Sequence, residues 1–148
     1  MQSGLVLEPS GREVDESNVT AAPGGDETIL LAEDDPSLRI SLRKTLSQMG
    51  YRVLDAATGA TALELWKENR DAIGLLLTDM TMPGGMTGKE LAQCLLQDAP
   101  KLKVIYMSAY SAKYAGKDFP LIEGDNFLAK PFDAAKLART IRGKLDAN

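Results

Sequence analysis

The chain has 148 residues, of which 44% are hydrophobic and 26% are charged, and its formal net charge is −4. These values are those of one ordinary globular domain with a short extension. No apolar run approaches the roughly 20 residues of a membrane-spanning helix, and the first residues lack the basic start of a secretory signal. The sequence contains no histidine, which excludes histidine kinases, Ser-His-Asp hydrolases and histidine-ligated metal sites.

Charge is unevenly distributed along the chain. Residues 1–27 contain six acidic residues and one arginine, whereas the rest of the chain contains 15 acidic and 16 basic residues. Residues 1–26 are rich in proline, glycine and acidic residues, so we predict a flexible acidic tether there and one folded domain over residues 27–148. Because this domain is almost neutral, we expect no nucleic-acid binding.

Cys94 is the single cysteine of the sequence and has no partner for an internal disulfide. A protein without disulfides fits a reducing compartment, so we expect a cytoplasmic location and no membrane contact by this chain itself. We also expect Cys94 to be a small buried residue of a helix.

From Thr28 onward, short apolar runs alternate with segments of helical periodicity. Apolar runs without polar alternation are typical of strands that are buried on both faces of a parallel sheet. Five such strands are predicted, at residues 28–33, 51–55, 73–78, 102–107 and 126–128. Parallel strands with right-handed crossovers at this close spacing predict an open α/β sandwich of three layers and exclude a barrel.

Helices are expected between these strands, about five in all. Asp35, Thr58 and Asp133 are suitable N-caps for three of them. A fourth helix is expected over about residues 87–98. Residues 110–124, which contain two glycines and one proline, leave room for one short helix at most.

Polar residues follow four of the predicted strands at their carboxyl ends. They are Glu33 and Asp34 after the first strand, Asp79 after the third, Ser108 after the fourth and Lys130 after the fifth. The carboxyl ends of parallel strands meet at one edge of the sheet, where open α/β folds bind ligands. Three carboxylates repel one another unless a cation neutralises them, and hard oxygen ligands favour Mg²⁺ or Ca²⁺.

These residue types suit a reaction in which an aspartate attacks phosphorus. A carboxylate nucleophile needs no separate general base, while a metal ion, Lys130 and Ser108 can stabilise charge on the phosphoryl oxygens. Asp79 by itself would be an ordinary turn residue. Its predicted position beside the other four polar residues favours a site.

Four segments closely resemble the receiver domain of two-component response regulators: ILLAEDDPSLR, LLLTDMTMPGGMTGKELA, VIYMSAY and FLAKPF. The resemblance runs from about residue 28 to the end. It implies a flavodoxin-like fold with strand order 2-1-3-4-5. It also implies that Asp79 is the phosphoacceptor, that Asp34 binds Mg²⁺ directly and Glu33 in the outer shell, and that the main-chain carbonyl of Thr81 is a further ligand.

The resemblance assigns roles to three more residues. Ser108 and Lys130 would bind the phosphoryl group, and Phe127 would be the aromatic residue whose rotamer follows the state of Ser108, although an ordinary core position explains Phe127 equally well. The Lys130-Pro131 peptide is a candidate cis bond. The phosphoryl donor would be the phosphohistidine of a histidine kinase or a phosphotransfer domain.

The acidic tether and the segments MSAY and FLAKPF are most similar to the C-terminal receiver of hybrid sensor histidine kinases. A free-standing response regulator is the alternative, and the oligomeric state stays open. In both cases the chain would be a signalling domain, not an enzyme, with self-phosphorylation and self-dephosphorylation as its only reactions.

The sequence departs from the family pattern at two places. Glu33 replaces the commoner aspartate, and Gly84-Gly85 predicts one extra residue in the loop after Asp79. Two other functions fit the sequence less well. A phosphatase of the haloacid dehalogenase type needs a second aspartate where this chain has Thr81, and a flavodoxin-like cofactor binder needs a phosphate-binding glycine run that is missing here.

Overall fold

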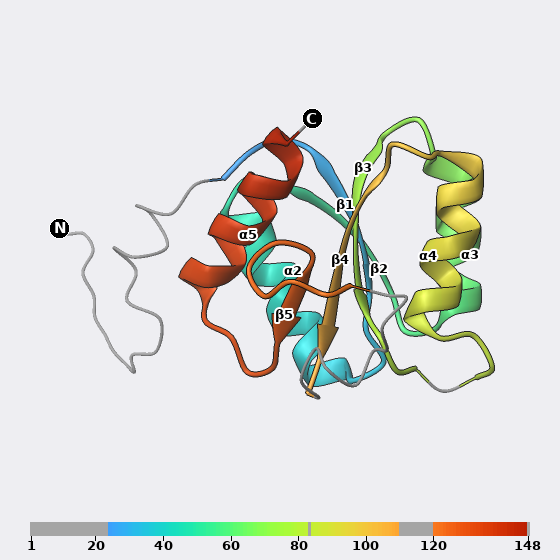
Figure 1. Ribbon diagram of the computed structural model, residues 1–148, viewed down its shortest axis with the longest axis horizontal. Helices are drawn as coiled ribbons and strands as arrows, with labels where there is room; N and C mark the ends of the chain where they lie inside the picture. The colour runs from blue at the N-terminus through green and yellow to red at the C-terminus, as the bar shows by residue number, and fades with distance from the viewer. Residues whose placement is uncertain (1–23, 83, 110–119, 148) are drawn as a thin grey trace, which may run out of the picture.

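The computed structural model describes residues 24–82, 84–109 and 120–147. A five-stranded sheet forms the central layer, with α2 and α5 on one face and α3 and α4 on the other (Figure 1). The strands are β1 (Thr28–Ala32), β2 (Arg52–Ala56), β3 (Ile73–Asp79), β4 (Lys103–Ser108) and β5 (Phe127–Ala129). Each predicted strand boundary agrees with the structure within one residue.

All neighbouring strands are parallel, and their order is β2-β1-β3-β4-β5. The predicted flavodoxin-like order is therefore confirmed. β1 and β3 lie side by side in the middle of the sheet, with Ala32 opposite Thr78. This register brings the acidic residues that follow β1 next to Asp79 at the end of β3.

Four helices lie within the described ranges: α2 (Pro36–Gln48), α3 (Gly59–Asn69), α4 (Gly88–Asp98) and α5 (Ala134–Asp146). The predicted N-caps are confirmed, because the side chains of Asp35, Thr58 and Asp133 each accept a hydrogen bond from the first turn of the following helix. The remaining prediction, of one short helix within residues 110–124, falls largely on residues 110–119, which lie outside the described residues. No helix in the described part of the chain has the length and apolar character needed to cross a membrane.

The core has two parts, one on each face of the sheet. Leu46 of α2 and Ile141 of α5 belong to one cluster, and Trp66 of α3 and Leu91 of α4 belong to the other. The expectation that Cys94 is buried is wrong, because its side chain is exposed on α4. The inner face of α4 is formed by other residues, namely Gly88, Leu91, Ala92 and Leu95.

The boundary of the folded domain stays a prediction, because residues 1–23 lie outside the described part. The carbonyl of Gly24 accepts a hydrogen bond from Arg142 of α5 at 3.0 Å. The amide of Gly25 donates to the carbonyl of Met49, the C-cap of α2, at 3.2 Å. The chain therefore enters β1 along the carboxyl ends of α2 and α5.

Candidate functional site

The three acids after β1 have three different surroundings. Glu33 is fully buried, and one of its carboxylate oxygens accepts a hydrogen bond from the amide of Asp35 at 3.0 Å. Asp34 is half-buried. Asp35 is exposed and caps α2, since its carboxylate accepts the amide hydrogen of Ser37 at 3.0 Å. Glu33 and Asp34 are thus the two acids of this run that remain for the site.

Asp79 is held at the end of β3 by its own backbone and by its carboxylate. It is 7% exposed. One carboxylate oxygen accepts the amide hydrogen of Thr81 at 3.2 Å, and the Thr78 hydroxyl donates to the Asp79 carbonyl at 2.9 Å. The Thr81 amide therefore fixes the orientation of the Asp79 carboxylate through one of its two oxygens.

Lys130 connects the two buried acids across the sheet. Its Nζ donates to Glu33 Oε1 at 2.9 Å and to Asp79 Oδ2 at 3.2 Å. Its main-chain amide donates to the carbonyl of Ser108 at 2.8 Å, which fixes the start of this segment against β4. The peptide bond to Pro131 is cis, as expected.

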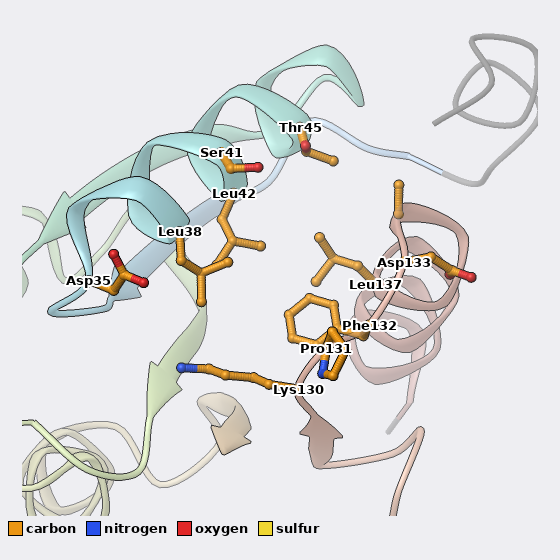
Figure 2. A pocket seen from close by; sticks show the side chains of 11 residues that line it. Asp35, Leu38, Ser41, Leu42, Thr45, Lys130, Pro131, Phe132, Asp133 and Leu137 are labelled. Carbon is orange, nitrogen blue, oxygen red and sulfur yellow. The ribbon is translucent and has the colours of Figure 1, made fainter. Parts of the chain in front are cut away.

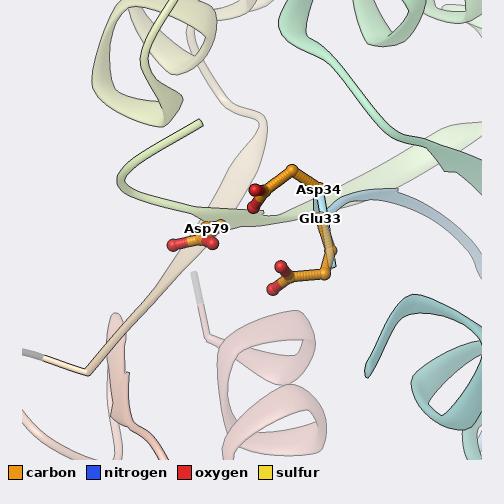
Figure 3. Close-up of side chains that lie close together, drawn as sticks. All are labelled: Glu33, Asp34 and Asp79. Atoms are coloured by element: carbon orange, nitrogen blue, oxygen red, sulfur yellow. The ribbon is translucent and has the colours of Figure 1, made fainter. Parts of the chain in front are cut away.

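Three carboxylates converge at this edge of the sheet. One oxygen each from Glu33, Asp34 and Asp79 lies within 4.8 Å of the others (Figure 3). Oxygens bound to one Mg²⁺ lie at most about 4.2 Å apart, twice the bond length, so a small contraction of the cluster would be enough. With Lys130 as the cation that bridges them, the cluster keeps two formal negative charges. The residues therefore fit a divalent cation in charge and in ligand type.

The electrostatics of the site agree with this excess of negative charge. Burial raises the pKa of Glu33, and the nearby Asp79 carboxylate adds to the rise, while the Asp35 amide and Lys130 oppose it. Lys130 is itself partly desolvated, which lowers its pKa, but the hydrogen bond to Glu33 and the charge of Asp79 outweigh this and raise it. A buried carboxylate whose charge is disfavoured gains most from a bound cation.

Three further residues were predicted to belong to the site. Ser108 ends β4 and is buried, with its backbone paired to Lys130. Thr81 is exposed, and its amide donates to the Asp79 carboxylate. Phe127 is 1% exposed and packs in the core cluster on the α3–α4 face of the sheet. The structure thus places Ser108 and Thr81 beside the acids and Phe127 in the core below that edge.

The loop between Asp79 and α4 contains Gly84 and Gly85, where the sequence predicts one extra residue. Gly84 and Gly85 both have φ of +94°. A Cβ atom added at either residue would have no other heavy atom within 4 Å. Positive φ values at two successive positions are readily adopted only by glycine. Both glycines therefore lie in open space, and the extra residue itself stays a prediction.

Two residues that support the site were not predicted. Arg39 of α2 donates to the main-chain carbonyl of Glu33 at 2.9 Å. Gly88 begins α4 so close to β3 that a Cβ atom there would collide with the carbonyl of Asp79. Arg39 lies in a segment whose residue spacing predicts a helix. Nothing in the sequence indicates that its side chain reaches the Glu33 carbonyl.

Comparison with known proteins identifies the family. The model described as "Response regulator receiver domain" matches residues 29–142. The chain belongs to this family. It is therefore a receiver domain of two-component signal transduction, as the sequence motifs predicted.

The chain is similar to two curated relatives of very different length. Response regulator receiver protein CpdR of Brucella abortus is 37% identical over 119 residues, which cover 80% of this chain and 97% of CpdR. Sensor kinase CckA of the same organism is 33% identical over 122 residues, which cover 82% of this chain but only 13% of CckA. The receiver therefore resembles both a small regulator and a small part of a large kinase.

Solved structures agree with this placement. The receiver domain from hybrid histidine kinase CckA matches with a TM-score of 0.67 and 32% identity, over 80% of this chain and 99% of that one. Response regulator TrrA from Thermotoga maritima, solved in complex with Mg²⁺-BeF, matches with a TM-score of 0.65 and 25% identity, over 79% and 97% of the two chains. Both matches cover the receiver fold as a whole.

A pocket lies beside the acidic site, between α2 and the start of α5 (Figure 2). Its volume is about 330 Å³. Leu38 and Leu42 line it from α2, Phe132 and Leu137 line it from the other side, and Lys130 lies at its edge. The receiver thus has a partly apolar surface directly next to the lysine that contacts Asp79.

Proposed function

We propose that Asp79 accepts a phosphoryl group from a phosphohistidine and that Mg²⁺ is required for this transfer. The observation that carries the proposal is the cluster of three carboxylates within 4.8 Å, two of them joined by Lys130. Asp34 and Asp79 would bind the ion directly, Glu33 through water, and the Thr81 carbonyl as a further ligand. The Mg²⁺-BeF complex of the relative TrrA agrees with a metal ion at such a site.

In the proposed transfer, a carboxylate oxygen of Asp79 forms the new bond to phosphorus. The bond between phosphorus and the imidazole nitrogen of the donor breaks, and this nitrogen keeps the electron pair. Lys130 moves its contact from the Asp79 carboxylate to a phosphoryl oxygen, and the Ser108 hydroxyl binds another. Mg²⁺, when bound, offsets the charge of the phosphoryl oxygens. Attack of water on phosphorus later releases phosphate and restores Asp79.

The switch is part of the same proposal. Ser108 and Phe127 lie on adjacent strands, since Ser108 is opposite Ala129 and Tyr106 is opposite Phe127. A change in the contact of Ser108 with the phosphoryl group would change the packing that Phe127 can adopt. Burial of Phe127 in the α3–α4 core gives such a change a path to those helices.

The partner is proposed to be a histidine kinase or a histidine phosphotransfer domain. Its phosphohistidine must reach Asp79 at the edge of the sheet where Lys130 contacts the acids. The adjoining pocket between α2 and α5 offers apolar surface at this edge, so we place the donor domain there. The likeness to CckA favours a hybrid kinase as the parent protein, with a free-standing regulator like CpdR as the alternative. The single cysteine agrees with a cytoplasmic setting.

The direct test is intact-mass measurement after incubation with acetyl phosphate, with Mg²⁺ or with a chelator. We expect one added phosphoryl group per chain with Mg²⁺ and none after chelation. Asp79→Asn should remove the signal, while Asp71→Asn, at an exposed aspartate before β3, should keep it. Equal phosphorylation of the Asp79→Asn variant would contradict the proposal. With beryllofluoride and Mg²⁺, the amide resonances of Asp79, Ser108 and Phe127 should shift in the wild type.

A further inference from the structure

Arg39 connects α2 to the first acid of the site. Its Nη1 donates to the carbonyl oxygen of Glu33 at 2.9 Å, and its Nε lies 3.3 Å from Asp55 Oδ2 at the end of β2. The side chain is 19% exposed and that of Asp55 is 23% exposed. Both contacts are therefore largely shielded from solvent, which makes them stronger than a surface ion pair.

The carbonyl that Arg39 binds belongs to the peptide between Glu33 and Asp34. The amide of Glu33 donates to the carbonyl of Ala56 at 3.0 Å, and its carboxylate binds Asp35 and Lys130. Arg39 supplies the remaining contact, at the carbonyl oxygen. Because the Asp34 side chain starts on the far side of this peptide, the orientation of the peptide decides where the Asp34 carboxylate points.

The carboxylates of the site repel one another, so an unrestrained Asp34 would turn away from Glu33 and Asp79. A charge-assisted hydrogen bond to the peptide resists this rotation. Arg39 also carries positive charge, which by itself would disfavour a cation nearby. Since Asp55 pairs with that charge at 3.3 Å, the positioning effect is the larger of the two.

We propose that Arg39 is a positioning residue for the acidic site and that it raises the affinity of the site for Mg²⁺. Asp55 holds the guanidinium in place and so contributes indirectly from β2. This inference rests on the proposed function, since it concerns the cation of the same site.

Arg43 provides a matched control. It lies one turn further along α2 and contacts the same Asp55 carboxylate, at 3.7 Å, with a side chain that is 46% exposed. Arg43 thus shares the Asp55 contact with Arg39, whereas the hydrogen bond to the Glu33 carbonyl comes from Arg39. Replacing Arg43 therefore removes an arginine contact to Asp55 while leaving the Glu33 peptide bonded.

The test is calorimetric titration of Mg²⁺ into the wild type, Arg39→Gln, Arg39→Lys and Arg43→Gln, together with urea unfolding in a chelator. Outer-shell partners of metal ligands typically change affinity by 10–100-fold, so we expect about tenfold weaker binding for Arg39→Gln. Arg39→Lys, which keeps the charge but lacks the planar fork, should lose less. Arg43→Gln should bind Mg²⁺ like the wild type.

Two results would overturn the inference while leaving the proposed function intact. One is wild-type Mg²⁺ affinity in Arg39→Gln, and the other is an equal loss of affinity in Arg43→Gln. If Arg39→Gln does not fold, the Mg²⁺ affinities of Arg39→Lys and Asp55→Asn test the inference instead. Wild-type Mg²⁺ affinity in both variants would overturn the inference. Failure of the wild type itself to bind Mg²⁺ is a different result, which overturns the proposed function and this inference together.

Discussion

The arrangement of one cation between two carboxylates occurs at two opposite edges of the sheet. At the carboxyl edge, Lys130 contacts Glu33 at 2.9 Å and Asp79 at 3.2 Å. The side chains of these acids are only 1% and 10% exposed. Asp34 adds a third carboxylate to this group.

At the other edge, Arg142 of α5 contacts Glu27 at 2.7 Å and Asp146 at 2.9 Å. These acids are 32% and 65% exposed. Arg142 also binds the carbonyl of Gly24, so it joins the residues before β1 to α5. Here the charges are solvated, and the group is a clamp between two segments of the chain.

The two groups contain the same kinds of charge but differ in burial and in the third acid. Solvent weakens each interaction of the exposed clamp and also relieves its excess charge. The buried group has no such relief, so it keeps a negative charge that a divalent cation can neutralise. Burial, more than the identity of the charged residues, distinguishes the structural clamp from the acidic cluster that we propose binds a cation.

The largest expected difference between the two charged groups is in how much each contributes to the unfolding free energy of the metal-free protein. Lys130→Met leaves Glu33 and Asp79 buried without a cation and should lower the unfolding free energy by about 3 kcal/mol. Arg142→Met removes a solvated clamp and should cost at most about 1 kcal/mol. Urea unfolding of both variants in a chelator measures the difference. Equal losses would show that burial does not distinguish the two groups.

A second, smaller effect concerns the pocket beside Lys130, a feature that distinguishes the Lys130 group from the Arg142 clamp. Ser41 is an exposed residue of α2 that lines this pocket. Ser41→Arg should slow phosphoryl transfer from a protein donor by about tenfold, since an added charge must be desolvated on docking, while transfer from acetyl phosphate stays unchanged. Ser47→Arg, on the same helix but outside the pocket, is the control. A slower reaction with acetyl phosphate as well would place the effect in the site itself.

The smallest expected effect is on the pH dependence of the unfolding free energy, to which Glu27 and Glu33 contribute with opposite signs. The hydrogen bond from Arg142 lowers the pKa of Glu27 below its usual value of 4.5. The clamp therefore stabilises the fold above that pH, and its contribution is lost as the pH falls through the lower folded value. Burial raises the pKa of Glu33, so without metal its charge opposes folding near neutral pH and the penalty is relieved on acidification.

Urea unfolding in a chelator at a series of acidic pH values separates the two contributions. Arg142→Met should remove the loss of stability at the acid end, by a few tenths of a kcal/mol. Glu33→Gln should remove the gain of stability that the wild type shows as the pH falls from neutral toward 4.5, the usual pKa of this side chain. The same pH profile for the wild type and Glu33→Gln would contradict the assigned pKa shift.

The sequence predicted the sheet and the acidic cluster because both depend on local patterns. Apolar runs without alternation mark buried strands, and residues at their carboxyl ends must meet once the strands are parallel. These patterns predict that Glu33, Asp34, Asp79 and Lys130 lie at one edge of the sheet. The extra residue expected at Gly84-Gly85 comes from the loop spacing of the family and stays a prediction, while the positive φ values of both residues explain why glycine stands there.

Other features depend on tertiary geometry that local patterns do not contain. The contact of Arg39 with the Glu33 carbonyl depends on how α2 packs against β1 and β2, and a basic residue on a helix usually faces solvent. The exposure of Cys94 follows from which side of α4 packs on the sheet, and its neighbour Leu95 occupies that side. The hydrogen bond from the Thr81 amide to Asp79 likewise depends on the path of the loop, while the role of the Thr81 carbonyl stays a prediction.

The close approach of Gly88 to Asp79 has a mechanical consequence. No methyl group fits between the first residue of α4 and the main chain at the end of β3, and the Gly88 amide also donates to the Met80 carbonyl at 3.1 Å. These two segments are consequently in direct main-chain contact, with no space for a side chain between them. A backbone displacement at Asp79, such as the proposed phosphorylation would cause, would therefore be transmitted to the amino end of α4 and along this helix to the exposed Asp98.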